Sequence, residues 1–205
     1  MRQSDLLRRA ADNGRLRPEP GKAGVKTRFA ADSMLGSLSR KLRAMGFDTF
    51  YFRDGEDSEL VALCRTEGRA LLTADRALVG WASARGVTAI LVVGETDGQR
   101  ISSIAKSAAA MALPLEVGDP LCSLCNGELV RVPKESASLK VPEAVRARHR
   151  DYFQCSACGH LYWKGSHWKK LRSLRSRLRS KGNDTHTGAG RRAGDPGKGH
   201  PRVLR

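Results

Sequence analysis

The sequence has few aromatic residues and lacks a long apolar run. Aromatic side chains make up 5% of its 205 residues. No stretch of about 18 consecutive apolar residues occurs, which is the length that a transmembrane helix needs. The first twenty residues also lack the apolar segment of a signal peptide. We therefore expect a cytoplasmic protein without a membrane span.

Several signatures of known chemistry are also missing. The chain has no GxxxxGK[ST] loop, which argues against nucleotide triphosphate binding by a P-loop. No histidine precedes His149, so a metal-free ribonuclease built on a histidine pair is disfavoured. We find no helix-turn-helix pattern or other motif that would read bases, which weighs against a DNA-binding regulator.

Positive charge is abundant and lies at the two ends of the chain. Residues 1–28 carry eight Lys or Arg against three Asp or Glu, and residues 164–205 carry thirteen against two. Residues 29–163 carry sixteen of each. Basic ends of this kind usually bind phosphate backbones without sequence preference, so an anionic partner with a phosphate backbone is expected. A solubilising tail that contacts nothing is the alternative.

Four of the five cysteines form two CxxC pairs, Cys122–Cys125 and Cys155–Cys158. Such pairs are typical of a structural zinc site, because each tight turn offers two sulfurs to one tetrahedral ion. The 29 residues between the pairs should hold a small insertion or a helix. Disulfides and a redox-active CxxC are less favoured alternatives. Cys64 lies among apolar residues and is expected to be a small buried side chain.

Apolar residues between positions 28 and 113 predict alternating strands and helices. Strands are expected at 28–31, 49–52, 70–73 and 88–93. Helices are expected at 33–45 and 58–67, from the end of the third strand through Ala84, and at 99–113. The first helix should pack through one apolar face, formed by Met34, Leu35, Leu38, Leu42 and Met45. This alternation predicts an α/β domain with a mainly parallel sheet.

Composition divides the remaining chain into further segments. Residues 1–27 form a basic flexible arm, the α/β domain covers 28–113, a linker covers 114–120, and a cysteine domain covers 121–168. Leu171, Leu174 and Leu178 recur at helical spacing, which predicts a basic amphipathic helix over 169–180. Residues 181–205 have almost no apolar side chains and are expected to be disordered.

Three aspartates lie at the end of a predicted strand or at the start of a predicted helix. Asp32 ends the first strand, Asp75 ends the third, and Asp57 opens the second helix. Ligands of such sheets bind outside the carboxyl ends of the strands, so the three should share one edge. Each could instead be only a helix N-cap. A divalent cation such as Mg²⁺ would relieve their mutual repulsion and suits phosphodiester hydrolysis.

These residues resemble a known family, the Mut-seven C-terminal RNase domain family, a PIN-like group. The resemblance covers about residues 28–168 and rests on Phe29–Gly36, Leu42–Asp48, Leu71–Arg76, Cys122–Asn126, Cys155–Gly159 and Tyr162–His167. It implies a PIN-like nuclease domain fused to a zinc ribbon. Asp32 and Asp75 occupy motif positions. Asp57 matches the acidic residue that opens the family's second helix, and Asp54, Glu56 and Glu59 are alternatives for that position. Either Glu95 or Asp97 would supply a fourth acid.

The residues and the resemblance thus predict a Mg²⁺- or Mn²⁺-dependent ribonuclease that acts on RNA through Asp32, Asp57 and Asp75 and holds a structural zinc ion. PIN-like domains commonly pair, so a homodimer is one option for its assembly. Expected RNA contacts are Arg40, Lys41, Lys164, His167, Trp168, Lys169 and Lys170. Trp163 is expected instead to belong to the ribbon's small core or its contact with the PIN-like domain. The alternatives are a catalytically inactive RNA- or ribosome-binding protein, a zinc-ribbon DNA-binding regulator, and a toxin.

Overall fold

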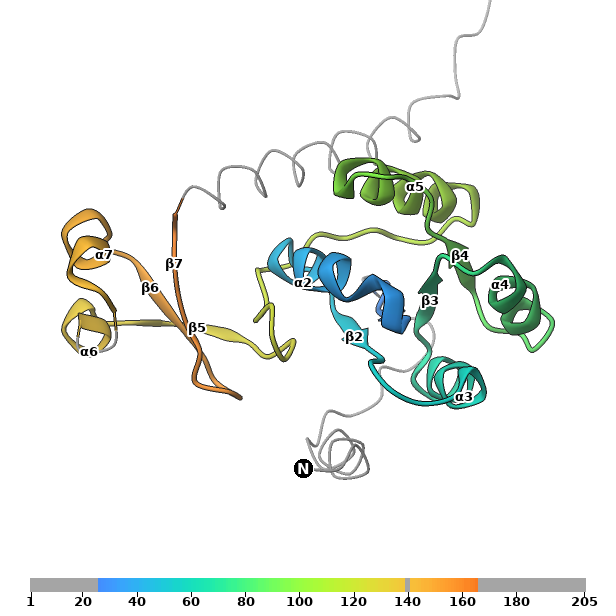
Figure 1. The fold of residues 1–205 in the computed structure, drawn as a ribbon, viewed down its shortest axis with the longest axis horizontal. Coiled ribbons are helices and arrows are strands. Elements are labelled where there is room, and N and C mark those ends of the chain that lie inside the picture. The colour runs from blue at the N-terminus through green and yellow to red at the C-terminus, as the bar shows by residue number, and fades with distance from the viewer. Residues whose placement is uncertain (1–25, 139–140, 166–205) are drawn as a thin grey trace, which may run out of the picture.

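The computed structural model describes residues 26–138 and 141–165, which form two separate sheets (Figure 1). Most of the basic arm, the helix expected at 169–180 and the tail after it lie outside the described residues. Within the described part of the chain, no helix is both long enough and apolar enough to cross a membrane. The two sheets correspond to the expected α/β domain and cysteine domain.

The first sheet has four parallel strands in the order β2-β1-β3-β4, which confirms the predicted fold class. Strands alternate with helices along the chain because each crossover returns the chain to the same end of the sheet. Its elements are β1 Phe29–Ala31, the 3-10 turn η1 Ser33–Leu35, α2 Gly36–Ala44, β2 Thr49–Tyr51, α3 Asp57–Glu67, β3 Ala70–Thr73, α4 Arg76–Ser83, β4 Ala89–Leu91 and α5 Asp97–Ala110.

Helices cover both faces of this sheet. Phe29 and Ala31 of β1 point to one face, where they pack with buried residues of α2 and α5. Ala30 points to the other face and packs with buried residues of α3 and α4. Because both faces are covered, every residue of the central strands β1 and β3 is buried, as expected for a parallel sheet. The carboxyl ends of the strands therefore remain as the accessible edge.

The entry to α2 differs from the expected continuous helix at 33–45. Residues 33–35 form the 3-10 turn η1, and the α-helix begins at Gly36. Met34 is 59% exposed, so its predicted place on the apolar face of the helix is wrong. A 3-10 turn has about three residues per turn, and this rotates Met34 away from the face that buries Leu35 and Leu38.

The segment expected to be a linker, 114–120, packs closely against the α/β domain. Leu115 and Val117 contact the apolar cluster between the sheet and α2 and α5. The Gly118 amide donates to the Gly46 carbonyl over 3.2 Å. At Gly46, a Cβ atom would lie 2.2 Å from the Gly118 oxygen, so this close approach needs a glycine. The segment is thus part of the folded domain.

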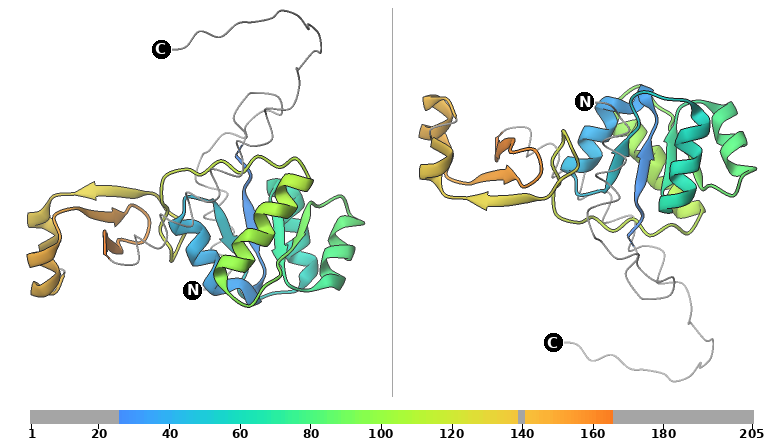
Figure 2. Two further views of the ribbon diagram at one scale, coloured as in Figure 1. Left: turned by 90° about the horizontal axis from the view of Figure 1, so that it is seen from above. Right: turned by 90° about the horizontal axis from the view of Figure 1, so that it is seen from below.

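The cysteine domain is a three-stranded antiparallel sheet, hereafter the ribbon, in the order β5-β6-β7. Its elements are β5 Leu129–Val132, α6 Lys134–Ser138, α7 Glu143–Arg148, β6 Tyr152–Cys155 and β7 Leu161–Trp163. The two short helices fill the gap between the CxxC pairs, which confirms the expected insertion. The ribbon stands to one side of the α/β domain, with these helices at its far end (Figure 2).

The ribbon's apolar core is small. Among the described residues it contains buried Ala137, Val141 and Tyr152, with Val132 and Leu161 partly buried beside them. Trp163 is 38% exposed and does not belong to this cluster, which contradicts the first of its two expected places, the ribbon core. Its alternative place, in a contact with the α/β domain, stays a prediction. Trp163 pairs in register with Tyr152, but the strand ends there and leaves one side of the indole open to solvent.

Candidate zinc centre and acidic edge

The sulfur atoms of Cys122, Cys125, Cys155 and Cys158 all lie within 4.8 Å of one another. The Cys122 and Cys158 sulfurs are 3.6 Å apart, and the Cys125 and Cys155 sulfurs are 3.4 Å apart. Four thiol groups at these separations can surround one tetrahedral ion, and sulfur ligands favour zinc. The sequence prediction of a four-cysteine metal site is therefore matched by a set of side chains that can hold a metal such as zinc.

Each CxxC pair sits on a tight hydrogen-bonded turn. In the first, the Asn126 amide donates to the Cys122 carbonyl over 2.9 Å, and the Cys122 amide donates to the Gly127 carbonyl over 2.8 Å. A Cβ atom on Gly127 would lie 2.8 Å from the Cys155 sulfur, so only glycine lets the two turns approach. In the second, the Gly159 amide donates to the Cys155 carbonyl over 3.0 Å.

Tyr162 on β7 supports the first turn from the ribbon side. Its hydroxyl oxygen lies 3.0 Å from the Cys122 sulfur and 3.2 Å from the Ser123 hydroxyl. Burial acts against the Cys122 thiolate, but hydrogen bonds from Tyr162 and from the amides of Cys125 and Leu124 lower the pKa of Cys122 to about 7. These hydrogen bonds favour the thiolate of Cys122, which is the form that binds metal, whereas burial raises the pKa of Cys125 in the same turn.

Asp32 and Asp75 lie at the carboxyl ends of the adjacent parallel strands β1 and β3, and Thr73 joins them. The Thr73 hydroxyl donates to Asp32 Oδ2 over 2.7 Å and accepts the Asp75 amide over 3.0 Å. Asp32 is 9% exposed, whereas Asp75 is exposed. Asp75 Oδ1 also accepts the Ala77 amide over 2.7 Å and so caps α4. Both carboxylates are held in place by the ends of regular elements.

Asp57 is the first residue of α3, in agreement with its predicted position. The helix cap is Glu56, whose side chain accepts the Glu59 amide while the Glu59 side chain accepts the Glu56 amide. The N-cap alternative therefore does not apply to Asp57. Its carboxylate is exposed in the first turn of α3, where the helix dipole favours negative charge.

Asp97, one of the two candidates for a fourth acid, forms an ion pair with Lys41 of α2. The two side chains are 34% and 37% exposed. Asp97 begins α5, which Thr96 and Gln99 cap through a reciprocal pair of hydrogen bonds. Glu95 is exposed, and its amide donates to the Gln99 side chain over 2.9 Å. Lys41, a predicted phosphate contact, and Asp97, a predicted metal ligand, thus neutralise each other's charge.

The acids share an edge of the sheet but do not form a compact ligand group. Among the described residues, the four cysteines are the group of His, Cys, Asp or Glu side chains that lie close enough together to hold a metal ion. Asp32, Asp57, Asp75 and Asp97 are each held by their own strand end or helix start. The donor chemistry nevertheless suits a hard cation, because carboxylate oxygens are the ligands that Mg²⁺ and Mn²⁺ prefer.

Few of the predicted RNA contacts fall within the described residues. Arg40 is exposed on α2. The Lys164 ammonium lies 3.7 Å from Asp151 Oδ2 and 5.5 Å from the ring centre of Phe153. Predicted contacts that lie outside the described residues are His167, Trp168, Lys169 and Lys170.

Cys64 is 1% exposed, which confirms its expected place in the apolar core. Burial raises the pKa of its thiol to about 12, so the group stays protonated at neutral pH. A thiol in this state is a poor nucleophile, and Cys64 has no part in the sites described above.

Sequence reasoning missed several residues that hold these sites in place, namely Thr73, Tyr162, Arg43 and Asn126. Thr73 had a usable signal, because it is a polar residue that ends an otherwise apolar strand. Arg43 had none, because a lysine or arginine on an amphipathic helix normally faces solvent. In the structure Arg43 is 5% exposed, and burial lowers the pKa of its guanidinium.

Comparison with known protein families finds a match to the family model described as the Mut7-C RNAse domain, over residues 27–188. The matched range includes the parallel sheet, the acidic edge and all four clustered cysteines. No curated protein and no solved structure matches the chain.

Proposed function

Because the chain belongs to the Mut7-C RNAse domain family, we propose that it is a divalent-metal-dependent ribonuclease that hydrolyses RNA phosphodiester bonds. The observation that carries the proposal is the pair of carboxylates at the ends of β1 and β3. Asp32 and Asp75 follow adjacent parallel strands. The Thr73 hydroxyl donates to the Asp32 carboxylate and accepts the backbone amide of Asp75. This is the edge at which open parallel sheets bind their ligands.

Asp32 and Asp75 would hold Mg²⁺ or Mn²⁺, and Asp57 and Asp97 are further candidate ligands. When bound, such a cation supplies an activated water nucleophile and positive charge for the phosphate oxygens. Asp32 Oδ2 accepts one hydrogen bond from Thr73, which leaves a second lone pair on the same oxygen for a cation. Thr73 is thereby a positioning residue that fixes the orientation of the Asp32 carboxylate.

Lys41 and Asp97 would exchange partners when substrate and cation bind. In the described structure they neutralise each other at the surface beside α2 and α5. A cation near Asp97 and a phosphate near Lys41 would each replace the charge that the ion pair now supplies. Because both side chains are about one-third exposed, the exchange needs only rotation of long side chains and little loss of burial.

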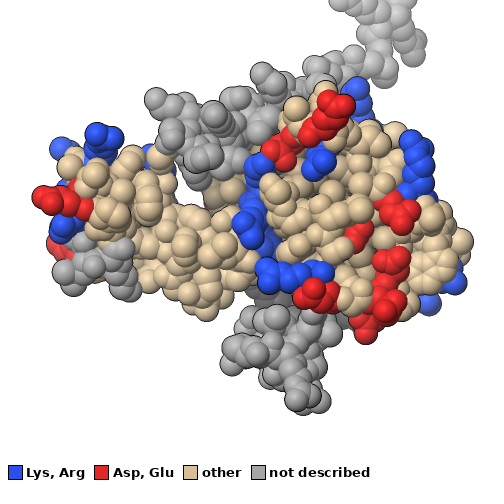
Figure 3. Space-filling model, in the orientation of Figure 1, with Lys and Arg blue, Asp and Glu red and all other residues tan. Residues whose placement is uncertain are grey.

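The charge distribution supports a role for the ribbon in holding RNA. Residues 29–120 carry ten Lys or Arg and twelve Asp or Glu, whereas residues 121–164 carry seven and four. Lys and Arg side chains also form a band between the ribbon and the acidic face of the α/β domain (Figure 3). RNA phosphates would lie against the Lys and Arg side chains of this band and of the ribbon. The scissile phosphate would then approach the acidic edge while the remaining phosphates stay away from its carboxylates.

Cleavage of a single-stranded RNA and a structured RNA by the full-length protein tests the proposal. Reactions would contain Mn²⁺, Mg²⁺ or EDTA. We expect metal-dependent cutting that falls at least about 100-fold in an Asp32→Asn/Asp75→Asn double variant. Glu116→Gln, which neutralises an exposed acid on the packed segment 114–120, should cut like the wild type. Far-UV circular dichroism and zinc content would show that each variant keeps its fold.

The other outcomes separate the remaining functions. Salt-sensitive RNA binding without cutting under any metal would favour an inactive RNA- or ribosome-binding protein. Cutting that persists in the double variant would place the reaction at another site. Absence of RNA affinity would contradict the assignment of RNA as the substrate.

A further inference from the structure

Arg43 on α2 reaches out of the α/β domain and holds the first CxxC turn. Its Nη1 atom donates to the carbonyls of Ser123 and Leu124 over 3.1 and 2.9 Å. Its Nε atom donates to the Thr49 carbonyl over 2.7 Å. The guanidinium therefore bridges the first residue of β2 and the two residues between the first pair of cysteines.

Both carbonyls lie inside the first CxxC turn. The Ser123 carbonyl shares its peptide plane with the Leu124 amide, and the Leu124 carbonyl shares its plane with the Cys125 amide. Arg43 thus fixes two of the three peptide groups that join Cys122 to Cys125, and with them the relative placement of the two cysteines.

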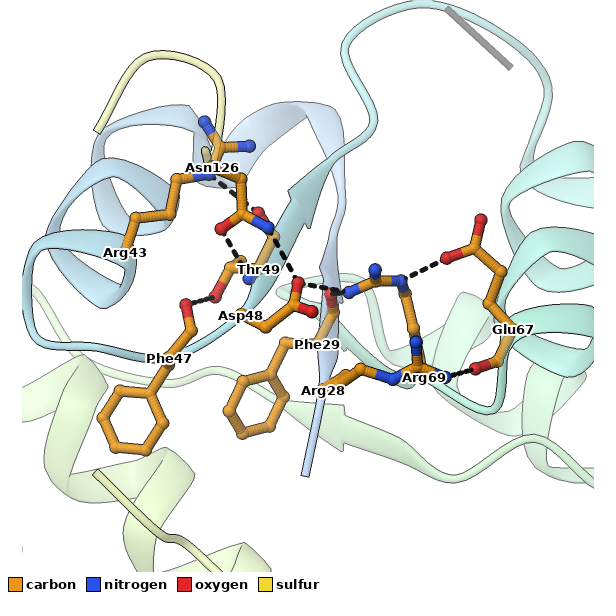
Figure 4. A network of polar contacts seen from close by, with 9 residues as sticks. All are labelled: Arg28, Phe29, Arg43, Phe47, Asp48, Thr49, Glu67, Arg69 and Asn126. Carbon is orange, nitrogen blue, oxygen red and sulfur yellow. Dashed lines mark hydrogen bonds and ion pairs between the residues drawn. The ribbon is translucent and has the colours of Figure 1, made fainter. Parts of the chain in front are cut away.

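Asn126 makes a second connection immediately after the turn (Figure 4). Its Oδ1 atom accepts the Thr49 amide over 3.1 Å, and its Nδ2 atom donates to Asp48 Oδ1 over 2.8 Å. The same Asp48 oxygen accepts Arg69 Nη1 over 2.7 Å, and Arg69 Nη1 also donates to the Phe29 carbonyl over 3.1 Å. The cysteine turn is thereby connected to the amino ends of β1 and β2.

Arg43 and the turn depend on each other for these contacts. With the turn in place Arg43 is 5% exposed, and movement of the Ser123 and Leu124 carbonyls would remove two of its acceptors. The surroundings of Arg43 are therefore satisfied when the turn holds the conformation that presents Cys122 and Cys125 together.

We propose that Arg43 is an outer-shell residue of the zinc site that the α/β domain supplies, and that it couples zinc binding to the stability of that domain. The coupling is reciprocal: zinc stabilises the parallel sheet, and the folded sheet raises the affinity for zinc. The inference concerns the metal of the four cysteines and holds whether or not the protein cleaves RNA.

The test measures zinc affinity of the full-length protein by competition with a chromophoric chelator. We expect Arg43→Met to weaken zinc binding about 10- to 100-fold, as is typical for outer-shell residues. Arg65→Met, which removes an exposed arginine from α3, should change the affinity less than about twofold by the same measure. Unchanged zinc affinity in a folded Arg43→Met protein would overturn the proposal.

Hydrogen exchange gives a second readout that does not depend on the Arg43 variant folding. Removing zinc from the wild-type protein should increase exchange in peptides that cover β1 and β3, on the far side of the network from the metal. In Asn126→Gly, which keeps the left-handed backbone at φ 69° but removes the side-chain bonds, this effect of zinc should shrink. An exchange rate of β1 and β3 that does not respond to zinc in the wild type would contradict the coupling.

Discussion

The α/β domain and the ribbon obtain their stability from different sources. Buried apolar clusters of 14 and 11 residues lie on the two faces of the parallel sheet. Among the described residues of the ribbon, the corresponding cluster has three buried members. So small a cluster cannot offset the entropy of ordering the ribbon, and a metal that crosslinks its two turns can. One chain thus joins a domain with an apolar core to a domain organised by four sulfurs.

The boundary between these regions resembles neither of them. Directional hydrogen bonds from Arg43 and Asn126 cross it. Apolar surfaces tolerate small displacements, whereas a network of buried polar groups depends on each member. We therefore expect a single substitution at the boundary to destabilise both regions, and a substitution inside one region to destabilise that region alone.

Removal of zinc should have the largest effect and separate the two regions most clearly. A structural zinc site contributes about 10–16 kcal/mol, which exceeds the net stability of a typical domain. We expect the ribbon strands β5, β6 and β7 to lose protection against hydrogen exchange, while the parallel sheet stays folded with reduced protection. Readdition of zinc should restore both. Ribbon amides that remain protected without metal would show that the ribbon folds through its apolar cluster.

Substitution of Gly46 should test the close packing at the boundary. Gly46 has φ 94°, and an added Cβ would lie 2.2 Å from the Gly118 oxygen. Gly68 has φ 63° and nothing within 4 Å of an added Cβ, so it isolates the cost of the backbone conformation. In chemical denaturation we expect Gly68→Ala to lose about 1 kcal/mol and Gly46→Ala about 3 kcal/mol. Equal losses would mean that segment 114–120 moves aside without cost.

Asp48→Asn should give the smallest effect and one that depends on pH. Burial raises the pKa of Asp48, but Arg69 and Asn126 outweigh it and leave the pKa below its usual value. Its contribution is therefore present above the unfolded pKa, near 3.9, and is lost as pH falls through the folded pKa. Because the side chain is 37% exposed, we expect a loss of about 1 kcal/mol in the variant at pH 7.

The pH dependence is checked by urea unfolding of both proteins between pH 3 and pH 7. The difference between wild type and Asp48→Asn should begin to shrink near the unfolded pKa of 3.9 and continue to shrink as the pH falls toward the lower folded pKa. A difference that stays constant across this range would show that the Asp48 charge is not what connects Arg69 to the cysteine turn.

The sequence predicted the features that depend on local patterns. Short apolar runs between helical segments indicated the parallel sheet, and the two CxxC pairs indicated a four-sulfur site. Strands, helices and cysteine turns each form within a few residues, so their signals are local. Predictions of exposure were weaker. Met34 and Trp163 are both more exposed than expected, because a short 3-10 turn and the end of a strand change which way a side chain points.

The contacts between polar residues that are distant in the sequence became visible in the tertiary structure. Lys41 pairs with Asp97, 56 residues away, and Arg43 reaches Ser123, 80 residues away. In the sequence, Lys41, Arg43 and Asp97 each look like an ordinary surface charge on a helix. Their partners depend on how the packed helices and the cysteine turn are placed in space, and no periodicity encodes that placement. Local sequence patterns thus set the elements and the four cysteines that can hold a metal, whereas packing set the network that joins them.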